Sequence, residues 1–329
     1  MSIKILITDC DHDSIEVECA VAAEAGVELE LAQCHTEDEV IAAAANADGI
    51  VVQYAPITAK VLDALPNLKS IGRYGVGVDT LDIQAATDRG VIISNVPDYG
   101  TEDVSDHAIA LALTLGRGTA RMDREIRAGQ FSLESIKPLH RFNTRVFGVL
   151  GLGLIGSATA RKAKGLGYEV IGFDPTREIG SVTDEGVAVV SQADLLARAD
   201  VISLHMPLNK HTHHLVDDEF LNNVKTGAVL INTCRGGVVD TDAVVRALES
   251  GKLYGAGLDV FEQEPMPGDH AILNQPNAVL TPHAAWYSEE SYTELKSRTI
   301  GNVIDYCLGK TPRNIYNPAA LENTRQPAN

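Results

Sequence analysis

Polar side chains that could bind an anion or transfer a proton follow several apolar runs of strand length. Arg235 comes after residues 229–231 and is followed by two glycines. An arginine in this place suits a two-pronged hold on a carboxylate and polarisation of an adjacent carbonyl, because the guanidinium presents paired N–H donors. A surface ion pair is the alternative for this residue taken alone.

His283 follows the apolar run 278–280 and lies three positions before Trp286, the only tryptophan of the chain. Histidine gains and loses a proton near neutral pH, so His283 is a candidate general acid/base, with a purely structural role as the alternative. Glu264 is one of three acids between residues 259 and 264. Only an acid that meets a histidine would be catalytic, and the Glu-Pro pair by itself reads as a loop entrance.

Two glycine-rich segments also follow strand-like runs. Residues 75–79, Gly-Val-Gly-Val-Asp, could bind a carboxylate through exposed backbone amides or form a tight turn. The second segment, GLGLIG at 151–156, is followed by a helical stretch. Gly151 permits a sharp turn out of the strand, Gly153 lets a pyrophosphate approach the backbone, and Gly156 lets the helix pack closely. The helix offers its N-terminal amides and dipole to phosphates.

Asp174 follows a second predicted strand, 169–173, and lies 18 positions after Gly156. This is close to the spacing of about 20 residues expected for an acid that binds the ribose of a dinucleotide. Strand, helix, strand and acid together favour a dinucleotide site over an ordinary glycine-rich loop. A carboxylate at Asp174 favours NAD because it repels a 2′-phosphate, whereas nearby Arg177 could favour NADP.

Parallel sheets must bring these strand ends together. Short apolar runs alternate with amphipathic stretches throughout, which predicts α/β architecture with doubly wound parallel sheets. A long helix is expected from Thr101 to about Arg117, continuing towards Gly129, and another over 288–308. The tail after Thr311 is expected to be loosely ordered. Further strands are predicted at 3–8, 28–32, 49–53, 70–73, 91–94, 145–150, 187–189, 201–205, 228–232, 255–259 and 278–280, and further helices at 14–25, 36–45, 58–65, 80–88, 192–197 and 240–250.

Composition excludes several classes of partner. The net charge of −18 argues against binding of nucleic acids or anionic membranes, which needs a basic face. Five cysteines without a CxxC pair suggest neither a disulfide framework nor a zinc site. The histidines at 211, 213 and 214 read as a solvated loop, so no metal is predicted. No apolar segment approaches the length of about 18 residues that a membrane span needs. The first residues read as a strand and not as a signal peptide, so a cytoplasmic location is expected.

The order of these motifs resembles the D-isomer-specific 2-hydroxyacid dehydrogenase family over residues 3–308. GRYGVGVDTLD at 72–82 resembles the substrate loop of the phosphoglycerate dehydrogenase branch. PHAAWYSE at 282–289 is similar to the C-terminal binding protein branch. The motifs that carry the overall resemblance are GLGLIG, Asp174, HMPL at 205–208, NTCRGG at 232–237, GLDVFEQEP at 257–265 and TPHAAW at 281–286.

The resemblance implies an NAD-dependent enzyme that interconverts 2-hydroxy and 2-keto acids by hydride transfer. Arg235, Glu264 and His283 would be catalytic, with His283 as acid/base, Glu264 orienting it, and Arg235 on the substrate carboxylate. Substrate-binding residues would be Tyr54, Val76, Gly77, Arg235, His283 and Trp286. Cofactor-binding residues would be Thr101, Gly151, Gly153, Leu154, Ile155, Gly156, Asp174, His205, Pro207, Thr212, Thr233, Cys234, Arg235, Asp259, His283 and Ala285, with Asp259 on the nicotinamide carboxamide.

The resemblance also implies two domains, each Rossmann-like or flavodoxin-like. A nucleotide domain, 101–286, would be inserted into a substrate-binding domain formed by 1–100 and 287–329. A homodimer built on the nucleotide domain is expected.

Gln53 and Tyr54 stand where phosphoglycerate dehydrogenases carry basic residues, which disfavours a phosphorylated substrate, although Arg73 could supply one charge. Tyr54 and Trp286 instead favour an apolar or aromatic 2-keto acid. The alternative function is an NAD(H)-sensing scaffold or corepressor, suggested by the PHAAWYSE segment.

Overall fold

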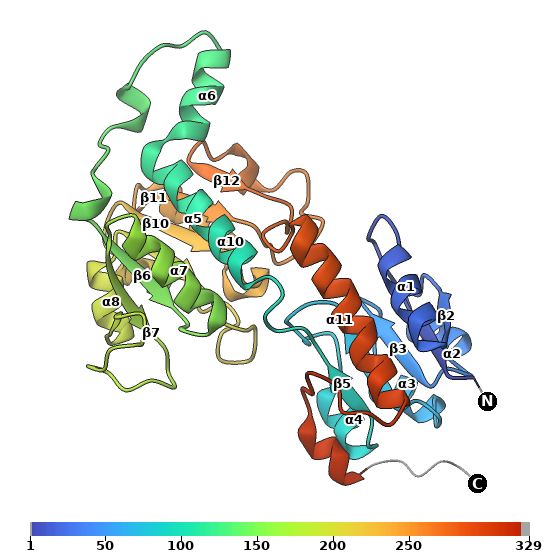
Figure 1. Cartoon of the computed structure of the whole chain (residues 1–329). Helices are drawn as coiled ribbons and strands as arrows, with labels where there is room; N and C mark the ends of the chain where they lie inside the picture. The colour runs from blue at the N-terminus through green and yellow to red at the C-terminus, as the bar shows by residue number, and fades with distance from the viewer. Residues whose placement is uncertain (1, 324–329) are drawn as a thin grey trace. The chain divides into compact units, whose positions relative to one another are not determined.

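The computed structural model describes residues 2–323, which form two compact units (Figure 1). The first unit comprises Met1–Gly100 and Ser288–Asn329, and the second is Thr101–Tyr287. No helix in the described range 2–323 is long and apolar enough to cross a membrane.

The first unit is built on a five-stranded parallel sheet in the order β2-β1-β3-β4-β5. All four residues of the central strand β3 are buried, whereas the edge strand β2 is mostly exposed and its Leu31 is 45% exposed. Helix α2 begins with a capping box, in which Thr36 and Glu39 bond each other's backbone amides. The bounds are β1 Lys4–Ile7, β2 Glu28–Leu31, β3 Gly49–Val52, β4 Ser70–Arg73 and β5 Ile92–Ser94, with α1 Glu16–Ala25, α2 Glu37–Ala43, α3 Ala59–Ala64 and α4 Ile83–Asp88.

The long C-terminal helix α11, Glu289–Cys307, packs against β3 and β4 of this sheet. Two glycines make room for it. A Cβ atom added to Gly49 would lie 2.4 Å from Cγ1 of Val303, and one added to Gly72 would lie 2.6 Å from Cγ2 of the same residue. The chain therefore returns to the sheet with which it began.

A fully buried ion pair joins α11 to α1. Nζ of Lys296 lies 3.0 Å from Oε1 of Glu18, and neither side chain is exposed. The same oxygen accepts a hydrogen bond of 2.6 Å from the Tyr74 hydroxyl, and Lys296 also donates to the Ser14 carbonyl at 2.6 Å. Burial raises the pKa of Tyr74 above its usual value, so its O–H remains a donor.

The prediction of a loosely ordered tail is wrong as far as Asn323. The 3-10 helix η5, Pro318–Asn323, packs against α4 and β5. Oδ1 of buried Asn317 accepts from the Ile93 amide at 2.7 Å, and its Nδ2 donates to the Val91 carbonyl at 3.0 Å. A polar residue thus extends the hydrogen bonding of edge strand β5, which composition alone did not reveal. The rest of the predicted tail, residues 324–329, lies outside the described part.

The second unit contains a seven-stranded parallel sheet in the order β12-β11-β10-β9-β6-β7-β8. Helices α5 and α7 share one apolar core with the sheet, and α8, α9 and α10 share another (Figure 1). The strands are β6 Val146–Leu150, β7 Glu169–Phe173, β8 Ala188–Val189, β9 Val201–Leu204, β10 Ala228–Asn232, β11 Leu253–Leu258 and β12 Ala278–Leu280. The helices are α5 Thr101–Arg117, α6 Thr119–Arg127, α7 Leu154–Gly165, α8 Gln192–Arg198, α9 Asp218–Asn223 and α10 Thr241–Glu249.

The helix expected to continue from Thr101 towards Gly129 is interrupted at Gly118. This residue has φ of 64°, and a Cβ there would lie 2.7 Å from Cγ2 of Ile136. The chain therefore changes direction between α5 and α6. Positive φ with a close neighbour explains why glycine stands at the break.

Candidate active site

His283 and Glu264 form a hydrogen-bonded pair at the carboxyl end of the second unit's sheet. Nδ1 of His283 lies 2.7 Å from Oε2 of Glu264, and the two side chains are 37% and 36% exposed. Glu264 Oε1 accepts from the Phe261 amide at 2.8 Å. Burial raises the pKa of Glu264, but the hydrogen bonds from His283 and Phe261 and the charge of Arg235 hold it below its usual value. An ionised Glu264 thus accepts a hydrogen bond from Nδ1–H of His283 and leaves Nε2 as the nitrogen that can exchange a proton with a ligand.

The loop that carries His283 is wrapped around a buried carboxylate. Asp259 accepts hydrogen bonds of 2.9 Å from the amides of Ala284 and Ala285, and one of 2.5 Å from the Thr281 hydroxyl. Its carbonyl accepts from the His283 amide at 2.7 Å. His283 itself has φ of 54°. A left-handed conformation costs an ordinary residue about 1–2 kcal/mol, so these bonds are needed to hold it.

Arg235 lies at the end of β10, just before the 3-10 helix η3, Gly236–Val238. Its Nη1 donates to the Cys234 carbonyl at 2.8 Å, and its own carbonyl accepts from Asn232 at 3.0 Å. Glycine is required next, because a Cβ on Gly236 would lie 1.9 Å from the Phe261 carbonyl oxygen. This close approach joins the segment after β10 to the one after β11.

The three predicted catalytic residues therefore come from the ends of β10, β11 and β12, which are neighbours in the sheet. The three acids predicted as alternatives are also distinguished. Asp259 holds the loop, and Glu262 accepts from Nε2 of His214 at 2.5 Å and from the Thr241 amide at 3.0 Å. Only Glu264 of these three is paired with His283, an outcome that spacing in the sequence could not decide.

The GLGLIG loop joins β6 to α7 where the order of strands reverses, since β6 pairs with both β7 and β9. Gly151 has φ of 92°, and a Cβ there would lie 2.3 Å from the His205 carbonyl oxygen. A Cβ on Gly156 would lie 1.9 Å from the Gly151 oxygen, whereas one on Gly153 would meet no described atom within 4 Å. Leu154, at the start of α7, is 57% exposed. The loop thus has an open face beside the helix N-terminus, which suits a pyrophosphate.

Asp174, at the end of β7, is arranged as an ionised acceptor. One oxygen accepts from the Leu152 amide at 2.9 Å, and the other from the Thr176 hydroxyl and amide. Burial raises its pKa, but these bonds and the charge of Arg177 hold the pKa below its usual value. Nη2 of Arg177 donates to the Leu152 carbonyl at 3.0 Å. A carboxylate and a guanidinium therefore both lie at the ribose end of the predicted cofactor site.

Two threonines predicted to touch a cofactor have buried hydroxyl oxygens that find no hydrogen-bond partner among residues 2–323. These are Oγ1 of Thr101 and Oγ1 of Thr233. A buried polar group left unpaired costs about 1–3 kcal/mol. Together with the open face at Gly153, these atoms fit a ligand with several hydrogen-bonding groups, as a nicotinamide dinucleotide is.

The remaining predicted cofactor residues have partners within the protein. Burial lowers the pKa of His205 to about 3, so this ring is neutral, and its Nε2 lies 2.8 Å from the Ser203 hydroxyl. Thr212 donates to the Pro207 carbonyl at 2.6 Å, which closes the loop between them. Burial raises the pKa of Cys234, whose thiol lies 3.1 Å from Oδ1 of Asn232. Ile155 is half-buried in the first turn of α7.

The predicted substrate residues are divided between the units. In the first unit, Val76 and Tyr54 are exposed, and Asn95 donates to the Val76 carbonyl at 2.6 Å. In the second, the ring of partly buried Trp286 stands edge-on to Tyr287. Sequence reasoning missed Asp9, whose carboxylate accepts from the amides of residues 53, 54 and 55 and so shapes the Tyr54 loop. Its position directly after the first strand was the available signal.

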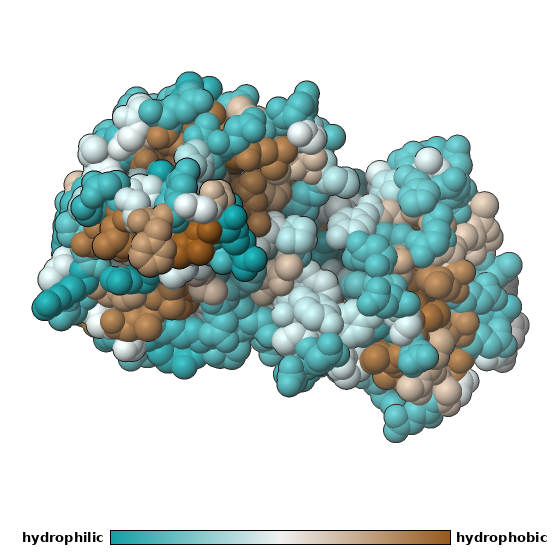
Figure 2. Space-filling view, turned by 90° about the horizontal axis from the view of Figure 1, so that it is seen from above, coloured by the Kyte–Doolittle hydropathy of each residue, from teal (hydrophilic) through white to brown (hydrophobic). Residues whose placement is uncertain are grey.

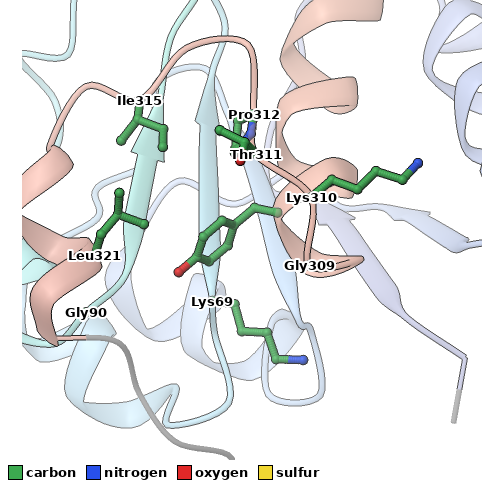
Figure 3. A pocket seen from close by; sticks show the side chains of 9 residues that line it. Lys69, Gly90, Gly309, Lys310, Thr311, Pro312, Ile315 and Leu321 are labelled. Atoms are coloured by element: carbon green, nitrogen blue, oxygen red, sulfur yellow. The ribbon is translucent and has the colours of Figure 1, made fainter.

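The first unit has two other features that resemble ligand sites. Ligand atoms of Cys10, His12 and Glu18 lie within 4.8 Å of one another, but the ammonium of Lys296 lies 3.4 Å from Nδ1 of His12 as well as beside Glu18, so a cation already occupies this cluster. A pocket of about 380 Å³ lies at the opposite end of the sheet from residues 75–79 (Figure 3). The side chains of Lys69 and Lys310 both extend out of the pocket, and Lys69 is bonded to Asp48 at 2.8 Å. No set of polar groups converges in this pocket among the residues that line it.

Known proteins similar to this chain agree with the geometry. Residues 109–285 match the family described as "D-isomer specific 2-hydroxyacid dehydrogenase, NAD binding domain". A glyoxylate reductase of Korarchaeum cryptofilum is 39% identical over 271 residues, which cover 81% of each chain.

Solved structures provide further similarity. The D-lactate dehydrogenase of Aquifex aeolicus, complexed with NAD and lactic acid, has a TM-score of 0.83 and 30% identity, covering 95% of this chain and 99% of that one. An acyclic imino acid reductase in complex with NADPH and D-Arg has a TM-score of 0.86 and 28% identity, with the same coverage. The two neighbours thus hold different nicotinamide cofactors.

Proposed function

The chain belongs to the D-isomer-specific 2-hydroxyacid dehydrogenase family, whose members are oxidoreductases acting on the CH–OH group of 2-hydroxy acids, and we propose that it works as a 2-keto acid reductase with His283 as general acid/base. The observation that carries this proposal is the 2.7 Å pair of His283 and Glu264, with Arg235 at a neighbouring strand end.

A bound nicotinamide cofactor supplies the hydride that reduces the keto carbon. His283 gives a proton from Nε2 to the keto oxygen, and takes it back when the alcohol is oxidised. Glu264 favours the protonated imidazole through its charge and fixes the orientation of the ring through Nδ1. Arg235 binds the substrate carboxylate and stabilises negative charge that develops on the keto oxygen.

NAD is the cofactor that we propose. Asp174 is ionised and has two oxygens at the end of β7, where a ribose diol can donate to it and a 2′-phosphate would be repelled. Arg177 is directed to the Leu152 carbonyl, which supports its role as part of the loop rather than as a phosphate ligand. The start of α7 and the hydroxyls of Thr101 and Thr233 would hold the rest of the cofactor.

A small 2-keto acid with an apolar or aromatic side chain is the substrate that we propose. Exposed Tyr54 is uncharged, as is Gln53, whose side chain accepts from the Asp11 amide at 2.9 Å. This loop therefore offers little to a phosphate. Trp286 supplies aromatic surface three residues beyond the proposed acid/base.

Steady-state kinetics test both parts of this proposal. We expect reduction of aliphatic or aromatic 2-keto acids with NADH, and loss of this activity in His283→Ala. Preference for glyoxylate or 3-phosphohydroxypyruvate would overturn the substrate assignment alone. No turnover of any 2-keto acid with NADH or NADPH would overturn the proposed function.

We also propose a homodimer built on the second unit. Ile126 on α6 and Phe131 and Leu133 in the segment after it are exposed, Phe131 to 94%. Figure 2 looks onto the end of this unit where α6 lies and shows hydrophobic residues gathered in patches among hydrophilic ones. Light scattering after gel filtration should give twice the mass of 35.2 kDa, and Phe131→Asp should shift it towards the monomer.

A cytoplasmic location is proposed as well. All five cysteines are free, which suits a reducing compartment. Fractionation of cells that produce the protein would test this assignment.

A further inference from the structure

His107 on α5 reaches the loop that carries His283. Its Nε2 lies 2.9 Å from Oγ1 of Thr281 and 3.6 Å from Oδ1 of Asp259. The side chain is 24% exposed, so the ring lies between solvent and the buried Asp259 carboxylate. This contact connects α5 to the loop. It involves none of the three proposed catalytic residues and no residue of the GLGLIG loop.

The hydrogen bonds define where the protons lie. Thr281 has a single hydroxyl proton, and its Oγ1 lies 2.5 Å from Oδ1 of Asp259. The Asp259 side chain also accepts from the amides of Ala284 and Ala285 and so acts as an acceptor, and Thr281 donates to it. Oγ1 of Thr281 must then accept from His107, which requires a proton on Nε2 of His107.

The chain of contacts continues to the proposed acid/base. The Asp259 carboxylate also accepts from the amides of Ala284 and Ala285, and its carbonyl accepts from the amide of His283. The His283 backbone is held in a left-handed conformation between these bonds. A change in the rotamer of Thr281 would therefore be transmitted to both sides of His283.

We propose that His107 is a positioning residue for the reaction: through Thr281 and Asp259, its Nε2–H fixes the loop that presents His283. This proposal rests on the proposed role of His283 as acid/base. As a positioning residue, His107 contacts neither the substrate nor the reacting atoms. Its function is to hold a hydroxyl in one orientation.

Three substitutions at position 107 separate this role from simple filling of space. Glutamine places an N–H donor near the position of Nε2, asparagine places it near Nδ1, and leucine has none. We expect His107→Leu and His107→Asn to lower kcat about 10- to 50-fold with KM changed less than about twofold, because small displacements of a catalytic group are costly. His107→Gln should retain activity within about threefold. Full activity of the leucine variant, or equal impairment of the glutamine and leucine variants, would overturn the proposal.

The single tryptophan provides a measurement that does not depend on activity. Trp286 lies at the end of the same loop. Acrylamide quenching of its fluorescence should increase at least about twofold in His107→Leu and return to the wild-type value in His107→Gln, with both variants melting as the wild type does. Unchanged quenching in the leucine variant would contradict a positioning role.

Long-range ¹H–¹⁵N NMR of histidine-labelled enzyme tests the proton assignment directly. We expect the His107 ring to carry its proton on Nε2, and a neutral ring protonated only on Nδ1 would refute the assignment. These two measurements separate the proposals. If the wild-type enzyme reduces no 2-keto acid, the proposed function fails, while quenching and NMR still decide whether His107 holds the loop.

Discussion

Nδ1 of His283 lies 2.7 Å from Oε2 of Glu264, although 18 residues lie between them in the sequence. The pair forms because β11 and β12 are adjacent parallel strands whose carboxyl ends meet at one edge of the sheet. Each partner remains about one-third exposed, so the imidazole is oriented without being sealed from a ligand. This relationship makes the chemistry of the site open to direct tests.

Replacement of the imidazole should remove proton transfer while leaving cofactor binding intact. For His283→Ala we expect kcat for 2-keto acid reduction to fall about 10²- to 10⁴-fold, the usual contribution of a general acid. Stopped-flow or steady-state kinetics with NADH measure this change. Quenching of Trp286 fluorescence by NADH provides the control, and a variant that keeps more than a tenth of the wild-type kcat would exclude His283 as the acid/base.

Removal of the charge on Glu264 should change the pH dependence. The pKa of Glu264 is held below its usual value, so its carboxylate is ionised throughout the neutral range. Glu264→Gln removes a negative charge beside the imidazole, which disfavours the protonated ring that reduction requires. We expect the alkaline limb of the kcat–pH profile for reduction to move by about one unit to lower pH. A profile superimposable on that of the wild type would show that Glu264 does not act through charge.

Cofactor preference should depend on Asp174. Asp174→Ala removes the carboxylate that repels a 2′-phosphate and accepts from a ribose diol. The ratio of kcat/KM for NADH to that for NADPH is expected to fall about 10-fold or more. Arg177→Ala is the matched control and should change this ratio less than about threefold, whereas a collapse of NADPH use in this control would assign Arg177 to phosphate binding.

Stability of the first unit should depend on the buried pair of Lys296 and Glu18. Lys296→Met leaves the Glu18 carboxylate buried without its cation, and breaking such a pair costs about 3–5 kcal/mol. For an enzyme of this size we expect the melting temperature to fall by about 10 °C. The double variant Lys296→Met/Glu18→Gln keeps an acceptor for the Tyr74 hydroxyl and should recover most of the loss. Equal melting temperatures for the single and double variants would show that the uncompensated charge is not the cause.

Local patterns were sufficient to predict the strands and the α/β class, because apolar runs of four or five residues such as 49–52 and 146–150 are buried on both faces. The motifs at Gly151, Arg235 and His283 were identified for a similar reason, since each directly follows a strand. The resemblance to a family then assigned roles to these residues that their spacing alone left open.

Features that depend on contacts distant in sequence could not be predicted in this way. The order of residues after Thr311 looks polar and irregular, but Asn317 pairs with Ile93 more than 200 positions away. Gly118 interrupts a helix because of Ile136, a neighbour supplied by a later segment. His107 lies 174 positions from Thr281. In each case the residue that makes the contact belongs to another element of the fold. The local pattern of apolar and polar residues does not predict such a contact.

Strand β12 lies at the edge of its sheet, yet the histidine that follows it is tied to the inner neighbour. The amides of His283, Ala284 and Ala285 all donate to Asp259, which directly follows β11. Local unfolding affects the edge strand of a sheet most easily. It would break the hydrogen bonds between β12 and β11 without releasing the imidazole of His283. Amide hydrogen exchange should accordingly be slower at residues 283–285 than in β12 itself, an inversion of the usual order in which a loop exchanges before its strand.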